Sequence, residues 1–119
     1  MLTGRYDHAS CALTDRLIYV FGGRSNFSQP IISIEVYDCE RYEWVKLNLN
    51  LLGGGSLVRQ IPFKYDSEHI ILFGGEIISR KNKQFSKSVQ IIHVMRRHGP
   101  RDIRTTPHSI QMLPSLQRA

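Results

Sequence analysis

The amino-acid sequence predicts an all-β fold built from two similar four-stranded antiparallel units. Three observations lead to this prediction. Short runs rich in β-branched and aromatic residues alternate with turns that contain Gly, Asn, Asp or Ser, a pattern typical of strands. Apolar residues nowhere keep the i, i+3, i+4 and i+7 spacing of an amphipathic helix. Finally, "LIYVFGGR" at 17–24 returns 52 residues later as "HIILFGGE" at 69–76, which indicates an internal repeat.

Each strand is predicted where such a run lies between turn residues. The segments "LTDR" at 13–16 and "YDSE" at 65–68 place Asp before the next strand, so each is expected to close a hairpin. The glycines of "LNLLGGGS" at 49–56 predict a flexible connection between the units. The predicted strands cover residues 9–13, 17–21, 32–37, 42–47, 57–64, 69–73 and 88–95, with an eighth near 103–105.

These elements divide the chain into a first unit over residues 1–52, a second unit over 53–105 and a C-terminal tail over 106–119. The division follows the repeat period of about 50 residues. The tail is expected because the alternating pattern decays after Met95, where three prolines follow.

The composition is that of a folded chain, with 41% hydrophobic residues. No apolar stretch approaches the roughly 20 residues that a membrane helix needs. The first ten residues lack the apolar core of a secretory signal, so a cytoplasmic location is expected. Cys11 and Cys39 have no metal-binding spacing and are expected to be reduced structural thiols.

The net charge of +6 is concentrated between residues 76 and 104, where eight basic side chains face two acidic ones. Strand parity predicts that these basic residues divide between the two ends of the sheet, and only Phe85 adds an aromatic ring. A nucleic-acid groove needs one continuous basic stripe with interleaved aromatic residues. A solvated loop or a docking surface for an acidic protein is therefore favoured over nucleic-acid binding.

The first unit contains four landmarks in order. Arg5 and His8 stand at its start, Gly22–Gly23 follow the second strand, and Tyr37 and Trp44 come next with six residues between them. With these landmarks the unit resembles a kelch repeat, which forms one blade of a kelch-type β-propeller.

The second unit resembles this repeat only in part. It keeps Gly74–Gly75 and the strand "SVQIIHV", which parallels "SIEVYDC" in the first unit. The shifted positions of the other landmarks hold Leu57, Gln60, Ile92 and Gly99. The second unit is therefore interpreted as a degenerate blade.

The resemblance implies a partial kelch-type β-propeller of two four-stranded antiparallel blades. The double glycine is expected to let neighbouring chain and a large ring approach the backbone, with Tyr37 and Trp44 filling the wedge between blades. Complete propellers have about four to eight blades. The chain is therefore interpreted as a fragment of a larger propeller, with self-association of copies or an eroded reading frame as alternatives.

The sequence predicts no catalytic, cofactor-binding or metal-binding residues. Asp7, His8 and Ser10 cannot form a relay because alternation along a strand separates Asp7 from the other two. Kelch-type folds include copper oxidases resembling galactose oxidase, but the five histidines show no ligand spacing. The acidic turn at 38–43 is expected to be solvated, with Arg41 as its counter-charge.

The function predicted is that of a non-enzymatic protein-interaction module, a scaffold or adaptor. A basic nucleic-acid-binding domain and a remnant of a galactose-oxidase-like propeller are the alternatives. The basic segment predicts an acidic protein partner, and the resemblance implies partners that are cytoskeletal or related to ubiquitin ligases. Partner contact is predicted in the loops between the second and third strands of each unit, at Arg24, Asn26, Phe27, Arg80, Lys81, Lys83, Phe85 and Lys87.

Overall fold

The computed structural model describes residues 1–26, 29–51, 57–77, 84–86, 88–94 and 108–113. These residues form strands, turns and isolated bridges, and none of them belongs to a helix. A helix long and apolar enough to cross a membrane is accordingly not found among them. The predicted all-β class is confirmed.

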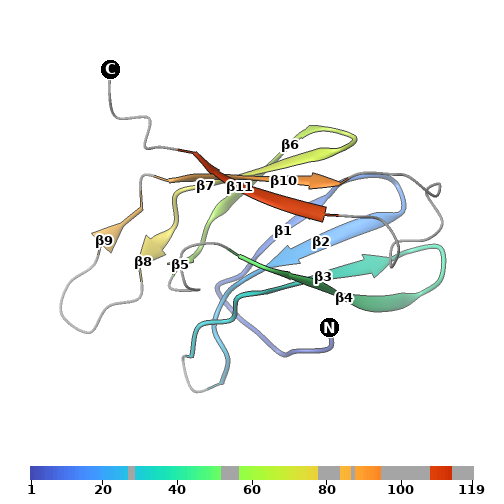
Figure 1. Ribbon diagram of the computed structural model, residues 1–119. Coiled ribbons are helices and arrows are strands. Elements are labelled where there is room, and N and C mark those ends of the chain that lie inside the picture. Colours follow the sequence, from blue (N-terminus) through green and yellow to red (C-terminus); the bar gives the residue numbers. More distant parts are fainter. Residues whose placement is uncertain (27–28, 52–56, 78–83, 87, 95–107, 114–119) are drawn as a thin grey trace.

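Two four-stranded antiparallel sheets make up the fold, as predicted (Figure 1). The first sheet has the order β1-β2-β3-β4, and the second has the order β11-β10-β7-β6. The first contains β1 (Ala9–Ala12), β2 (Leu17–Phe21), β3 (Ser33–Asp38) and β4 (Glu43–Asn50). The second contains β6 (Ile61–Asp66), β7 (His69–Phe73), β10 (Val89–Val94) and β11 (His108–Leu113).

A third, smaller sheet was not predicted. It has the order β5-β8-β9 and contains β5 (Leu57–Val58), β8 (Glu76–Ile77) and β9 (Gln84–Phe85). The single strand predicted over 57–64 is wrong, because Arg59 has a φ of 56° and separates β5 from β6. A left-handed residue cannot continue a pleated strand.

The fourth strand of the second sheet also differs from its prediction. The segment 103–105 lies outside the described residues, whereas β11 begins at His108 and pairs with β10 along its whole length. A strand therefore occupies residues that were expected to form a tail. The division of the chain at residue 52 stays a prediction.

The two units share their backbone conformation at the double glycine. Gly22 and Gly74 have φ values of 59° and 58°, and Gly23 and Gly75 have φ values of 96° and 104°. The residues at positions 7 and 59 are also equivalent, with φ values of 57° and 56°. The repeat of 52 residues that the sequence indicates is thus a structural repeat.

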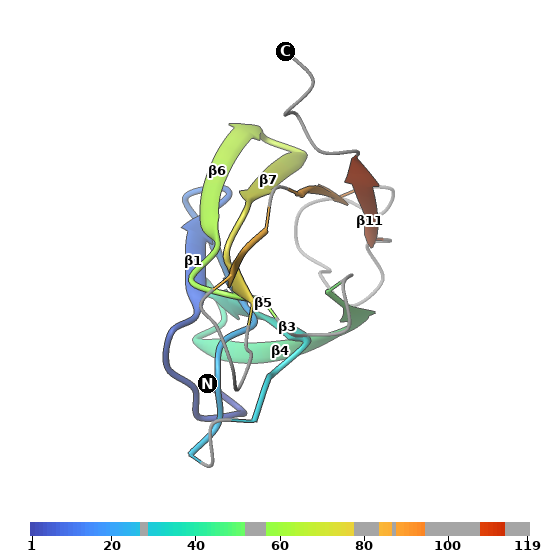
Figure 2. The same ribbon diagram turned by 90° about the vertical axis from the view of Figure 1, so that its left-hand side faces the viewer.

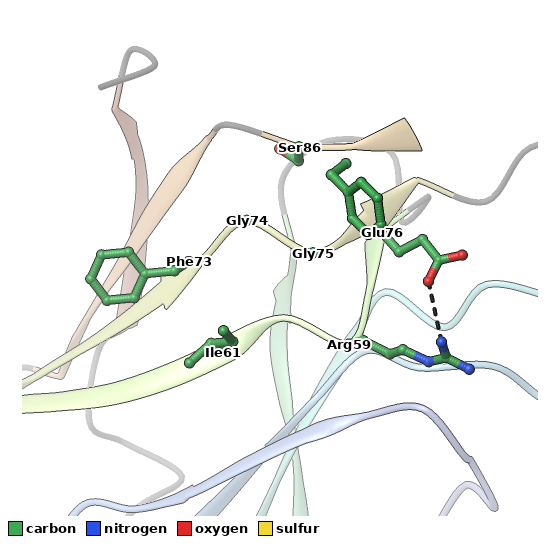
Figure 3. Close-up of a pocket in the computed structure, with 8 residues that line it drawn as sticks. Arg59, Ile61, Phe73, Gly74, Gly75, Glu76 and Ser86 are labelled. Carbon is green, nitrogen blue, oxygen red and sulfur yellow. Dashed lines mark hydrogen bonds and ion pairs between the residues drawn. The ribbon is translucent and has the colours of Figure 1, made fainter. Parts of the chain in front are cut away.

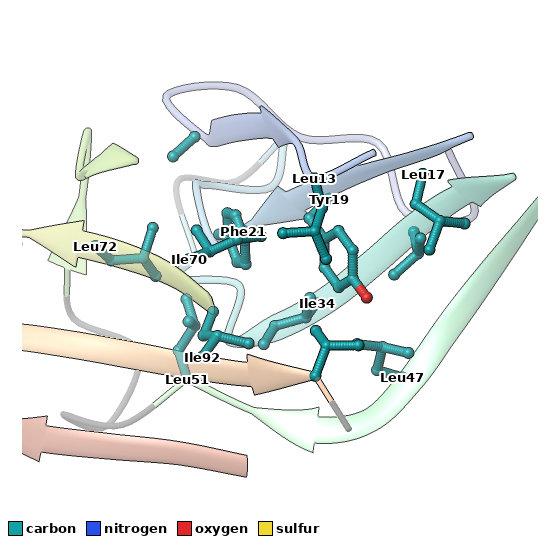
Figure 4. Close-up of a cluster of buried hydrophobic side chains, with 13 residues drawn as sticks. Leu13, Leu17, Tyr19, Phe21, Ile34, Leu47, Leu51, Ile70, Leu72 and Ile92 are labelled. Atoms are coloured by element: carbon teal, nitrogen blue, oxygen red, sulfur yellow. The ribbon is translucent and has the colours of Figure 1, made fainter. Parts of the chain in front are cut away.

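The core lies between the two sheets. Tyr19 and Phe21 on β2 pack with Ile70 and Leu72 on β7, and Ile92 on β10 completes the contact (Figure 4). Strands β1 and β6 lie side by side, so the sheets meet along their first strands (Figure 2). Each sheet therefore has a core face directed at the other sheet and an outer face directed away from it.

The outer faces follow from strand alternation. The first outer face contains Ile18, Val20, Glu35, Tyr37 and Trp44. The second outer face contains Ile61, Phe63, His69, Ile71, Phe73, Ile91 and His93.

The expected role of Tyr37 and Trp44 is corrected by this arrangement. Their rings contact each other with centroids 5.0 Å apart, but they lie on the first outer face and not between the two sheets. Tyr19 and Phe21 fill that space instead. In the second unit the residue equivalent to Tyr37 does pack between the sheets. This residue, Ile92, is fully buried against the first sheet.

The close approach of neighbouring chain to the double glycine is found as expected, but the approach of a large ring is not. A Cβ on Gly23 would lie 2.6 Å from the carbonyl oxygen of Tyr6 and 3.0 Å from the Cβ of His8. In the second unit a Cβ on Gly75 would lie 2.7 Å from the Cγ of Gln60. The double glycine therefore admits the segment that precedes the first strand of its own unit, and not an aromatic ring.

We expect Gly23→Ala to lower the free energy of unfolding by about 1–3 kcal/mol, because alanine would be held at a positive φ and would collide with the backbone of Tyr6. Gly4→Ala is the matched control, since nothing lies within 4 Å of the added Cβ. Urea unfolding followed by circular dichroism measures both variants. Equal losses in the two variants would contradict the prediction.

Candidate functional site

A buried ion pair supports the double glycine of the first unit. Arg5 forms an ion pair with Glu35, and both side chains are fully buried. One guanidinium nitrogen of Arg5 donates to the carbonyl oxygens of Gly22 and Ser33, each at 3.0 Å. The backbone amides of residues 2–3 donate to the Glu35 carboxylate at 2.6 and 3.2 Å. Arg5 therefore ties the start of the unit to the turn that follows β2.

The second unit replaces both members of this ion pair. By the repeat, Leu57 stands where Arg5 does, and Gln90, fully buried on β10, stands where Glu35 does on β3. Burying a charge without its partner costs several kcal/mol of folding free energy. Replacing only one member of the Arg5–Glu35 pair would therefore destabilise the unit. The second unit thus keeps the backbone of the first with uncharged residues at these two positions.

A row of four charged side chains runs across the double-glycine ends of both units. Asp7 contacts Arg24 at 3.4 Å within the first unit and Arg59 of the second unit at 3.2 Å. Arg59 in turn contacts Glu76 at 3.3 Å. The backbone amide of Arg59 also donates to the carbonyl oxygen of Asp7 at 2.9 Å. The row therefore alternates in charge and joins the two units.

Asp7 and Arg59 have opposite charges at equivalent positions of the repeat. Each pairs with the residue that follows its own double glycine, Arg24 in the first unit and Glu76 in the second. Hydrogen bonding to Asp7, together with the charges of Asp7 and Glu76, raises the pKa of Arg59. The second unit therefore has an ion pair at the same two repeat positions as the first unit, with the acidic and basic residues exchanged.

A hollow of about 450 Å³ lies beside this row in the second unit. Ile61 and Phe73 form its floor, and Arg59 and Glu76 lie on its rim (Figure 3). Phe85 also lines the hollow.

The family model of the Kelch motif matches residues 5–48. The match runs from Arg5 through β1, β2 and β3 into β4, and it confirms the kelch repeat that the sequence landmarks indicated. No curated protein matches the chain. The first sheet is therefore a blade of the kelch type, and the second repeats its backbone.

The predicted contact residues of the two units lie partly within the described structure. Arg24 is half-buried through its ion pair, Asn26 is exposed, and Phe85 is 68% exposed. Phe85 lies on β9, not in the loop where it was predicted. The chain leaves β2 and β7 at the same end of the two sheets, while the turns that join β1 to β2, β3 to β4 and β6 to β7 lie at the other end (Figure 1). Phe27, Arg80, Lys81, Lys83 and Lys87 lie outside the described residues.

The acidic turn at the opposite end of the first kelch blade is held by a residue that was not predicted. Arg16 contacts both carboxylate oxygens of Asp38, at 2.9 and 2.7 Å. Asp38 also accepts the backbone amides of Glu40 and Arg41 at 3.0 and 3.2 Å. The hydrogen bond from Arg16, with these amides, lowers the pKa of Asp38 to about 2. Arg16, not Arg41, is thus the counter-charge.

Two histidines that looked unrelated in the sequence meet on the second outer face. His69 and His93 are paired residues of β7 and β10, and their rings stack with centroids 4.5 Å apart. Asp66 lies 2.8 Å from the Nδ1 of His69, and this contact lowers the pKa of Asp66. Only the strand register brings the histidines together, and spacing along the sequence could not have revealed it. The described residues hold no group of three potential metal ligands.

Asp38 is expected to make the stability of the chain pH-dependent in acid. Its pKa is lower in the folded chain than the ordinary value of 3.8, so its contribution is complete above pH 4 and is lost as the pH falls toward 2. We expect a loss of about 2 kcal/mol between pH 5 and pH 2 from this group, measured by urea unfolding. Asp38→Asn should lose this contribution already at pH 5. A variant whose pH profile runs parallel to that of the wild type would show that Asp38 has no such role.

The buried pair of Arg5 and Glu35 is open to a double-mutant cycle. Glu35→Gln leaves the guanidinium buried without its charge partner, and we expect the free energy of unfolding to fall by about 3–5 kcal/mol. Arg5→Leu combined with Glu35→Gln installs the residues found at positions 57 and 90. The double variant should lose about 1–3 kcal/mol less than the sum of the single losses. Additive losses in thermal or urea unfolding would refute the coupling.

Proposed function

We propose that the chain is a non-enzymatic protein-interaction module of the kelch type, acting as a scaffold or adaptor in the cytoplasm. One observation carries the proposal. The loops that follow β2 and β7 both leave the same end of two packed blades, where positive-φ glycines and ion pairs hold their bases. Loops on a rigid scaffold are where binding residues are most often found.

The character of this end fits a protein partner. Phe85 presents an exposed aromatic ring beside a hollow with an apolar floor, and exposed aromatic residues are frequent anchors in protein interfaces. Arg24 and Asn26 lie at the base of the neighbouring loop. This combination supports contact by side chains from both loops.

The charge of the second loop suggests the chemistry of the partner. The segment from Arg80 to Lys87 contains four basic residues beside Phe85. Such a loop would attract an acidic protein surface, with an association rate that falls as salt rises. Cytoskeletal proteins and components of ubiquitin ligases are the classes that the kelch resemblance suggests.

A loop variant tests this proposal. Alanine at Arg80, Lys81, Lys83, Phe85 and Lys87 should remove proteins that the immobilised wild-type chain captures at low salt, as identified by mass spectrometry. The control combines Arg41→Ala with Tyr42→Asn, an exposed basic and aromatic pair at the opposite end of the blade, where Tyr42 is 82% exposed. Asparagine tolerates the positive φ of this position.

The control should retain the captured proteins, and raising the salt concentration should release them from the wild-type chain. Capture that persists unchanged in the loop variant would rule out the second loop as the binding element.

A further inference from the structure

The second outer face is apolar and uncovered. Ile61, Phe63 and Tyr65 on β6 are 66%, 53% and 67% exposed, and Phe73 on β7 is 37% exposed. Tyr65 and Ile71 also line a second hollow of about 280 Å³ on this face. Contiguous apolar surface of this kind on a folded chain marks an interaction site.

The equivalent face of the first sheet is covered, and its cover is known. Ile71 and Phe73 correspond by the repeat to Tyr19 and Phe21, which are buried against the core face of the second sheet. The second outer face is therefore a copy of a surface that, in this same chain, packs against another sheet.

The chain also carries the kind of surface that provides this cover. Ile70, Leu72 and Ile92 form the core face of the second sheet, and their counterparts Ile18, Val20 and Tyr37 lie on the first outer face. Val20 is already buried within the chain, so Ile18 and Tyr37, which are half-buried, remain for contact there. Tyr37 and Trp44 add two large rings there. The two outer faces of the chain thus correspond, by the repeat, to the two core faces that pack against each other inside it.

Charge complementarity indicates that these two halves fit a second copy. Within the chain, Asp7 of the first unit meets Arg59 at the equivalent position of the second unit, 3.2 Å away. If the same packing is repeated outward, Arg59 meets the residue at that position in the next sheet. When the next sheet is the first sheet of another copy, that residue is Asp7, so opposite charges alternate around the assembly.

We propose that the second outer face binds the first outer face of another copy of this chain, head to tail, and that two to four copies close into a ring. Such a ring would contain about four to eight sheets, which is the range of closed propellers. Arg59, 56% exposed in its side chain, would contact Asp7 of the neighbouring copy. The assembly would cover Ile61 and Phe73, which form the floor of the hollow beside Phe85. The loop variant leaves both residues unchanged and Phe63→Glu leaves the loop unchanged, so the two proposals are tested separately.

The first measurement is the molar mass of the full chain by size exclusion coupled to light scattering. We expect a single species at two to four times 13.7 kDa. Phe63→Glu places a charge in the centre of the second outer face and should reduce the mass to one copy while circular dichroism keeps its β signal. Tyr42→Asp, an equally drastic change at an exposed site away from both faces, should leave the mass unchanged.

Mixing two variants tests the head-to-tail geometry. Trp44→Glu blocks the first outer face, and Ile18→Glu serves the same purpose should Trp44→Glu lose its β signal. Each blocked variant alone should be a monomer, whereas an equimolar mixture with Phe63→Glu should yield a dimer of one copy each. Association through two second outer faces would instead leave the Trp44→Glu or Ile18→Glu variant associated, and association through two first outer faces would leave Phe63→Glu associated.

A wild-type chain that is monomeric at about 100 μM would overturn the proposal, because an interface of standard size binds more tightly than this. A mass that drifts upward with concentration without reaching a fixed multiple would overturn closure into a ring. An unchanged mass in Phe63→Glu would overturn the assignment of the second outer face.

Discussion

The double glycine at the end of the second strand is the constraint on which the rest of each unit depends. Its second glycine adopts a φ near 100° in both units, and the segment that enters the sheet passes against it too closely for any Cβ. This contact fixes where the first strand begins. It also holds the residue at position 7 or 59 in a left-handed conformation, from which its side chain reaches the neighbouring unit. The packing of strands, the row of charges and the bases of the loops all follow from this turn.

Side chains around the turn can change when they change together. The first unit supports its turn with a buried Arg5–Glu35 ion pair, and the second has Leu57 and Gln90 in the same places. At the rim, Asp7 with Arg24 becomes Arg59 with Glu76, which preserves attraction while inverting each charge. The second unit therefore keeps a kelch-like backbone although few of its sequence landmarks remain.

The sequence predicted those parts of the fold that depend on local patterns. Alternating runs and Asp-containing turns located most strands, and the repeated Phe-Gly-Gly revealed the second unit. The two-residue strands β5, β8 and β9 are too short to show a period, and the break at Arg59 depends on the approach to Gly75. The strand β11 follows a proline-containing segment in which alternation is weak.

The candidate site was harder to predict, because its contacts are set by strand register and by the face on which a residue lies. The pairs Arg16–Asp38 and His69–His93 join residues 22 and 24 positions apart that meet only across neighbouring strands. Tyr37 and Trp44 were recognised as packing residues, yet the sequence does not say which face of the blade they occupy. The exposed Phe85 was the one predicted loop aromatic that the structure places beside a hollow.

The interface between the two sheets is directional, and this property governs how further sheets could be added. The core face of the first sheet carries different side chains from the core face of the second sheet, against which it packs. The two outer faces of the chain are therefore also unlike. A two-fold symmetric contact would pair an outer surface with a copy of itself. A head-to-tail contact would instead repeat the packing observed within the chain, in which unlike faces meet and Asp7 contacts Arg59 at 3.2 Å. Head-to-tail contacts form rings when the rotation closes and open filaments when it does not. The rotation between neighbouring sheets would decide between these outcomes. Within the chain this rotation is the one that brings β1 beside β6, and strand twist contributes to it.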